Sequence, residues 1–167
     1  MTRFLSLLML ITLAVPCFAQ EDDPGAEKEK RIQYWRLQTS LYTYHFDPEP
    51  DHVNHQKLIN FEAWLKNDWH VGLALFDNSF GQSSQYLYVG KSWDFGESGH
   101  WYGRVTAGLL HGYEDEYEDK IPLNGLGVAP GIVPALGYQY KRVFAEVQLL
   151  GLAATMVTAG FTFGHGR

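Results

Sequence analysis

Residues 143–163 read VFAEVQLLGLAATMVTAGFTF, and this stretch decides the fold class. In its first part every second residue is apolar, while Glu146 and Gln148 fall on the other face. From residue 153 to Phe163 the alternation returns, again with one face more apolar than the other. Apolar residues at a period of two indicate β-strands. The stretch therefore predicts two strands, 143–150 and 153–163.

Similar segments recur upstream, each about ten residues long, rich in β-branched and aromatic types and separated by polar clusters. The eight predicted strands cover residues 35–46, 57–65, 69–79, 84–95, 101–113, 126–140, 143–150 and 153–163. Four tryptophans are candidates for a membrane interface: Trp64, Trp69, Trp93 and Trp101. Strand number, strand length and interfacial aromatics are typical of the smallest outer-membrane β-barrels, whose closure pairs every backbone group in lipid.

A soluble eight-stranded barrel of the lipocalin type shares this length and period and stays open as an alternative. Bulky apolar residues on both faces of several segments favour the membrane barrel, because lipid would lie outside and an apolar ligand inside. Downstream of the first 19 residues no stretch reaches the roughly 18 apolar residues of a membrane helix. The formal net charge of −6 speaks against a nucleic-acid partner.

The first 19 residues have the pattern of a secretory signal peptide, with Arg3, an apolar run, Pro16 and a small-residue exit at Ala19. Lipidation at Cys17 is the less favoured alternative. Cys17 is the only cysteine, so cleavage would leave no thiol and no disulfide. Residues 20–34 are predicted to form an interfacial segment, with either a short amphipathic helix over 26–35 or a frayed linker. Residues 35–167 are the predicted barrel.

Connection lengths predict the orientation of the barrel. The links 66–68, 96–100 and 141–142 are short, whereas 47–56 and 114–125 are long. Outer-membrane barrels have short periplasmic turns and longer outer loops, so the ends of the odd-numbered strands should face outward. Three polar residues are then expected on one rim: His45, Ser79 and His111.

That rim carries the parts of an acyl-transfer site. An imidazole, His45, can take a proton from a hydroxyl, and Ser79 can act as nucleophile or polar partner. A third group, Asp77 or Asn78, can orient the imidazole. From composition alone, solvated loop residues are the simpler interpretation of these side chains.

Several motifs resemble those of the lipid A palmitoyltransferases of the PagP type. They occur in order along a large part of the chain: Tyr44-His45, the run from Phe76 to Phe80, Thr106-Ala107-Gly108, Ile121-Pro122-Leu123, Pro134 and Leu136-Gly137-Tyr138. The resemblance implies an eight-stranded barrel, tilted in the outer membrane, that moves a palmitoyl chain from a phospholipid to lipid A. It implies no cofactor and no metal.

The resemblance also assigns roles to individual residues. His45 and Ser79 match the essential histidine and serine of the family. The family's aspartate directly precedes the serine, whereas here Asn78 stands there and Asp77 lies one step further back, which on a strand is the opposite face. The acid's role therefore falls either to Asp77, through a bulge, or to Asn78.

Four further positions are expected to contact substrate: Tyr44, Gly90, His111 and Pro134. Gly90 matches the glycine at the floor of the family's acyl-chain pocket, and its lack of a side chain would leave room for a longer chain. Pro134 matches a proline at a lateral gate for lipid, because it removes one ladder hydrogen bond from its strand. Strand 35–46 lacks the matching proline of the second gate.

Two other constellations are candidates for cation binding. Residues His45, Asp47, Asp51, His52 and His55 could bind a metal, but no third fixed ligand or supporting shell is evident, and a metal site is not favoured. Residues 114–119 form an acidic run, which is most simply a solvated outer loop and alternatively contacts cations that bridge lipopolysaccharide phosphates.

The sequence thus predicts a monomeric outer-membrane acyltransferase with a phospholipid donor and lipid A as acceptor. The alternative is a non-enzymatic barrel, either for passage of small solutes or with a structural role. A passage protein predicts a polar column through the lumen, while the acyltransferase predicts an apolar lumen closed below Gly90. A lipid A deacylase on this fold uses a rim histidine and serine near the C-terminus, and strand 153–163 has neither.

Overall fold

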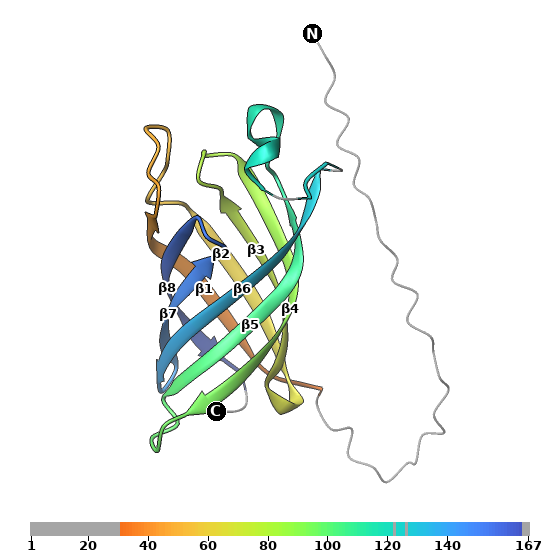
Figure 1. Cartoon of the computed structure of the whole chain (residues 1–167). Helices are drawn as coiled ribbons and strands as arrows, with labels where there is room; N and C mark the ends of the chain where they lie inside the picture. The colour runs from red at the N-terminus through yellow and green to blue at the C-terminus, as the bar shows by residue number, and fades with distance from the viewer. Residues whose placement is uncertain (1–30, 122, 126, 165–167) are drawn as a thin grey trace, which may run out of the picture.

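Eight antiparallel strands form a closed barrel in which every strand pairs with its neighbours in sequence and β8 closes onto β1 (Figure 1). The structure, a computed structural model, describes residues 31–121, 123–125 and 127–164. The elements are β1 (Ile32–His45), β2 (Leu58–Leu65), η1 (Lys66–Asp68), β3 (Trp69–Asp77), β4 (Ser83–Phe95), β5 (Trp101–His111), η2 (Asp115–Lys120), β6 (Val128–Tyr140), β7 (Val143–Leu150) and β8 (Ala154–Phe163). The predicted fold and all eight strands are confirmed.

The start of the barrel differs from the prediction. Strand β1 begins at Ile32, so the amphipathic helix over residues 26–35, one of the two alternatives for this segment, does not extend to residue 35, and the barrel begins before that residue. The β1–β2 ladder, which includes Trp35↔Ala63, holds this segment extended. The predicted signal peptide and Cys17 lie outside the described residues. No helix among those residues is long and apolar enough to cross a membrane.

Alternation along the strands separates a lumen face from an outer face. In β7, Phe144 and Glu146 are buried, while Val143 and Val147 are exposed, as the period of two predicts. The same parity corrects the assignment of Trp64 to a membrane interface. Trp64 shares its face of β2 with Asn60 and Glu62, and it is only 1% exposed inside the barrel.

Both long connections, residues 46–57 and 112–127, lie at one end of the barrel, whereas the opposite end carries short turns alone (Figure 1). The loop between β1 and β2, the β3–β4 turn and η2 are at one end, which carries His45 and Ser79 and is called the His45 rim below. Two contacts tie these loops together: Val53 N–H donates to the Ser79 carbonyl at 2.8 Å, and the Tyr117 hydroxyl donates to Asp51 at 3.2 Å. The predicted grouping of His45 with Ser79 on one rim is confirmed.

Within the barrel, an apolar layer lies on the side of the His45 rim. It consists of Leu58, Ala74, Tyr86, Tyr88 and Met156, with Phe76, Leu110, Val133 and Leu150 packed against it. These residues come from the strands β2 to β8, so the layer is built from segments far apart in sequence.

The rest of the lumen is polar, and the prediction of an apolar lumen is wrong there. Arg104 pairs with Glu62 and, at 3.2 Å, with Glu146, while Arg36 lies 3.5 Å from Glu146. All four side chains are at most 4% exposed. Tyr102 donates a hydrogen bond to Glu146 at 2.7 Å. Buried charges are tolerated when they are paired and hydrogen-bonded, and each charged group of this ion-pair layer has an oppositely charged partner, although Nε of Arg36 and Nε of Arg104 donate to no partner among the described residues.

A seam interrupts the wall near the His45 rim. The β6–β7 ladder runs only from Ala135↔Gln148 to Tyr140↔Val143, so residues 128–134 of β6 pair within the described structure with β5 alone. The β1–β2 ladder also ends early, at Gln38↔Asn60, but there the following loop bonds to β1, with Thr43 N–H donating to the Asn54 carbonyl. Pro134 stands where the β6–β7 ladder stops, as expected for a residue without an amide N–H.

Candidate functional site

His45 is the last residue of β1 and is 4% exposed. Its two ring nitrogens have different partners. Nε2 lies 2.9 Å from Ser79 Oγ, and Nδ1 lies 3.0 Å from Asn54 Oδ1. An amide oxygen can only accept, so Nδ1 carries the proton and donates it to Asn54. In the neutral ring this leaves Nε2 as acceptor for the Ser79 hydroxyl, which is the arrangement of a general base beside its nucleophile.

Backbone hydrogen bonds fix both partners of His45. Thr43 N–H in β1 donates to the Asn54 carbonyl at 2.8 Å, and Val53 N–H donates to the Ser79 carbonyl at the same distance. The loop between β1 and β2 is therefore attached on one side to β1 and on the other to the β3–β4 turn. A ring of the same loop, His52, stacks on His45 with centroids 4.2 Å apart.

Two further side chains surround the Ser79 hydroxyl. The Gln56 amide donates toward Ser79 Oγ at 3.4 Å, and the Thr43 hydroxyl donates to the Gln56 side-chain oxygen, which holds this side chain in a buried position. Burial raises the pKa of the Tyr113 phenol, and hydrogen bonds with Ser79 oppose this in part. Sequence analysis missed Asn54, Gln56 and Tyr113. No spacing pattern marks them, since they reach Ser79 only through the fold of two long loops.

Neither residue proposed for the acid's role contacts His45. Asn78 Oδ1 accepts from Phe80 N–H at 2.9 Å and Gln82 N–H at 3.0 Å, and its amide donates to the Gly112 carbonyl at 3.0 Å and to Gln82 Oε1 at 3.2 Å. These four hydrogen bonds use its amide to hold the β3–β4 turn and to tie that turn to Gly112, directly after β5. Asp77 lies two residues after Leu75 on β3 and therefore on the same, outer face of the barrel. The prediction that Asp77 or Asn78 orients His45 is wrong, because Asn54 occupies that position.

The remaining predicted residues are scattered. The side chains of Tyr44 and His111 are exposed on the outer face of β1 and β5, where they do not point at His45. Pro134 is half-buried and lies on the outer face of β6, beside the seam. The structure brings together only His45 and Ser79 from the predicted set.

Gly90 does not face open space. A Cβ atom at this position would collide with the ring of His70, which stacks on Trp64 with centroids 4.4 Å apart. The glycine is needed because the His70 ring fills the volume in front of it. The prediction that this glycine leaves room for a longer acyl chain is therefore wrong, and the ion-pair layer closes the lumen instead.

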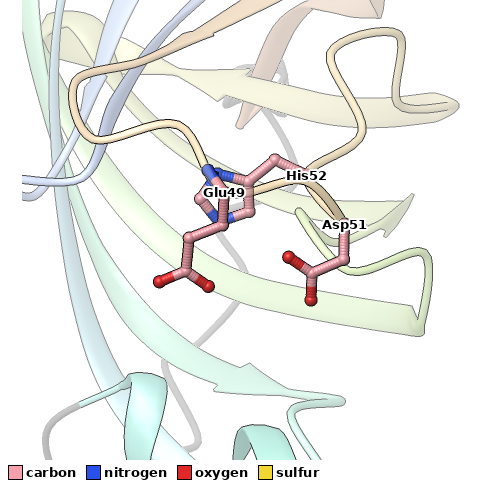
Figure 2. Close-up of side chains that lie close together, drawn as sticks. All are labelled: Glu49, Asp51 and His52. Carbon is pink, nitrogen blue, oxygen red and sulfur yellow. The ribbon is translucent and has the colours of Figure 1, made fainter.

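A possible cation cluster lies in the loop above His45. Ligand atoms of Glu49, Asp51 and His52 lie within 4.8 Å of one another, and Figure 2 shows the two carboxylates extending to the same side of the loop. However, His52 Nδ1 accepts the Glu49 N–H at 3.1 Å, which puts the proton of the neutral ring on Nε2. Neither nitrogen then offers a free lone pair, so His52 does not complete a metal site in this conformation.

Comparison with solved structures gives a structural neighbour at low identity. No family model matches the chain, and no curated protein matches it. The chain is similar to the outer membrane protein Ail of Yersinia pestis in a phospholipid bilayer nanodisc, with 13% sequence identity and a TM-score of 0.41. The match covers 78% of this chain and 99% of the Ail chain.

Proposed function

We propose that this protein is an outer-membrane acyltransferase that moves a long acyl chain from a phospholipid to lipid A. The observation that carries the proposal is the contact between Ser79 Oγ and His45 Nε2 at 2.9 Å, beside a buried apolar layer. A hydroxyl held by a base with a free lone pair is suited to acyl transfer.

The outer surface supports a membrane location. Large apolar side chains are exposed along the outward faces of the strands, among them Leu73, Leu87, Val89, Leu109 and Ile132. Exposed aromatic residues gather near the rim opposite His45, namely Trp69, Trp93, Phe95, Trp101, Tyr138 and Tyr140. An apolar band with an aromatic girdle is typical of barrels in the outer membrane, whereas a soluble barrel would expose its apolar surface to water.

Chemically, the transfer takes place in two half-reactions. Ser79 Oγ attacks the ester carbonyl carbon of the phospholipid while His45 Nε2 takes the hydroxyl proton. The ester C–O bond then breaks, and the lysophospholipid oxygen leaves with that proton. In the second half, a lipid A hydroxyl gives its proton to His45 and attacks the acyl-Ser79 carbonyl, and Ser79 Oγ recovers the proton. The Gln56 amide is a donor suited to the negative oxygen that forms in each half.

The wall and the lumen favour lipid substrates. The seam at β6–β7 lies near the His45 rim, and we propose that acyl chains of the bilayer pass between the strands there. Behind it lies the apolar layer, which suits a hydrocarbon chain. By contrast, passage of solutes would require the ion pairs of Arg104 with Glu62 and Glu146 to separate. A passage protein is therefore less favoured, whereas a barrel with a structural role is equally consistent with the fold.

Mass spectrometry of lipid A from cells with and without the gene tests the proposal. We expect the gene to add one long acyl chain to lipid A, and we expect His45→Ala and Ser79→Ala to abolish the addition at normal barrel levels. His55→Ala is a matched control, because His55 lies in the same loop and its ring bonds to the Leu41 carbonyl rather than to Ser79. Unchanged lipid A in the presence of a folded wild-type barrel would exclude the acyltransferase.

A further inference from the structure

We infer that Asn54 is the positioning residue that fixes the tautomer of His45, in the place where many such sites have a carboxylate. This inference rests on the proposed acyl transfer. It rests structurally on the 3.0 Å contact between His45 Nδ1 and Asn54 Oδ1, opposite the Ser79 contact of Nε2.

The direction of the amide decides what His45 can do. With Oδ1 toward the ring, Nδ1 holds the proton and Nε2 can accept the proton of Ser79. With the amide NH₂ toward the ring, Nδ1 would have to accept, so Nε2 would be protonated and could not act as a base. Asn54 is exposed, but the hydrogen bond from Thr43 N–H to its carbonyl fixes its backbone beside His45. The side chain is thus held in reach of Nδ1.

A neutral partner has a further chemical consequence. A carboxylate would stabilise the imidazolium that forms when Ser79 loses its proton, whereas an amide orients the ring without adding charge. The pH profile of the reaction should therefore respond when Asn54 is exchanged for aspartate. In Asn54→Asp both side-chain oxygens accept, so the tautomer is kept and a charge is added.

Other titratable groups near His45 must be separated from this effect. His52 stacks on the His45 ring, and the Glu49 and Asp51 carboxylates lie close to His52. Tyr113 lies beyond Ser79. From β8, Ala154 pairs with His45 and brings no charge. Replacement of His52 by phenylalanine keeps an aromatic ring against His45 and removes the nearest titrating neighbour.

The test compares the full-length barrel in mixed micelles of phospholipid and lipid A for wild type, Asn54→Leu and Asn54→Asp. Asn54→Leu is expected to lower kcat roughly a hundredfold with KM nearly unchanged, because it fills similar volume without an acceptor. Asn54→Asp is expected to retain transfer, with the acidic limb of kcat against pH moved up by about one unit or more. Asn67→Asp is the matched control, since Asn67 lies in η1 at the opposite rim and is expected to leave the profile unchanged.

Nitrogen NMR of the histidine rings gives a readout that does not need activity, with His52→Phe used to assign the neighbouring ring. The expected result is a proton on Nδ1 of His45 in wild type and Asn54→Asp, and a shift toward Nε2–H in Asn54→Leu. A wild-type tautomer in Asn54→Leu, or an unshifted pH profile in Asn54→Asp, would overturn the role of Asn54. A wild-type barrel with the expected tautomer but no acyl transfer would instead overturn the proposed function.

Discussion

Tyr113 is a residue of the site whose ionisation depends on its burial. Burial raises the pKa of its phenol, so the folded protein keeps the proton to higher pH than the unfolded chain does. The resulting stability is fully present below the ordinary phenol pKa and is lost as the pH rises through the raised value. Wild type should therefore lose more stability than Tyr113→Phe above about pH 10. Urea unfolding of both proteins at neutral and alkaline pH measures the difference. If the free energy of unfolding falls equally with pH in wild type and Tyr113→Phe, the stabilising effect of the Tyr113 proton is contradicted.

Two asparagines show how much of the site could be predicted from the sequence. His45 and Ser79 were predictable, because alternation and loop lengths place both at the same rim. Asn78 adjoins Ser79 in sequence and was a natural candidate, yet its amide bonds to the β3–β4 turn and to the Gly112 carbonyl after β5, not to His45. Asn54 was unpredictable, because it meets His45 through a loop whose path depends on long-range hydrogen bonds. Sequence proximity was a poor guide to contact at this rim.

At the scale of elements, the contact of β3 with β4 at Gly90 is testable by a double-mutant cycle. Gly90→Ala is expected to destabilise the barrel by about 1–3 kcal/mol, because the new Cβ meets the His70 ring. His70→Ala alone leaves a cavity beside Trp64. The double variant should lose less than the sum of the two single losses, since neighbours in contact are not additive. Urea midpoints in micelles supply the four values. Additive losses would show that the two positions do not touch.

The β6–β7 seam can be closed with a reversible link. Continuing the ladder by two residues past Ala135↔Gln148 brings Val133 opposite Leu150, and both pack on the apolar layer. A short cleavable thiol cross-linker between cysteines at these positions should lower acyl transfer, and cleavage should restore it. The matched control links Leu136 to Val147, which already pair in the ladder, and should leave transfer unchanged. Full activity of the linked Val133–Leu150 pair would exclude the seam as a route for lipid.

The strands themselves were predicted closely, because period-two alternation is a local signal. Strand β7 has the predicted bounds, and β4 begins one residue earlier than expected. The errors in assigning strand residues arose where residue type was used in place of the period-two alternation. Trp64 was assigned to the interface by residue type although its parity with Glu62 places it in the lumen, and the helix predicted up to Trp35 gave way to pairing with β2. The end of the β6–β7 ladder depends on the relative lengths of two strands, which no single segment encodes.

For the molecule as a whole, the lumen has two layers with different consequences for permeation. The apolar layer lies beside the His45 rim, and the ion-pair layer lies beyond it, with Arg104 joining Glu62 on β2 to Glu146 on β7. No single residue type predicts this division, since alternation marks which residues face inward but not which inward residues meet across the barrel. Complementary charges on strands distant in sequence become visible as a closed layer only in the folded barrel.

The ion-pair layer predicts that the barrel does not conduct. In a planar bilayer, wild type should show no steady ion current, because a solute would have to separate buried pairs whose disruption costs roughly 3–5 kcal/mol when one partner is lost. Glu62→Ala/Arg104→Ala removes one acid and one base together, so the remaining Arg36 and Glu146 still balance, and a small leak current should appear. Acyl transfer should persist in this variant, since His45 and Ser79 lie at the rim and do not contact the layer. A steady current through the wild-type barrel would contradict the closed lumen and would favour the passage protein. If wild type carries no current while the double variant leaks and still transfers acyl chains, the ion-pair layer closes the barrel and the His45 rim carries the chemistry, as two independent parts of the molecule.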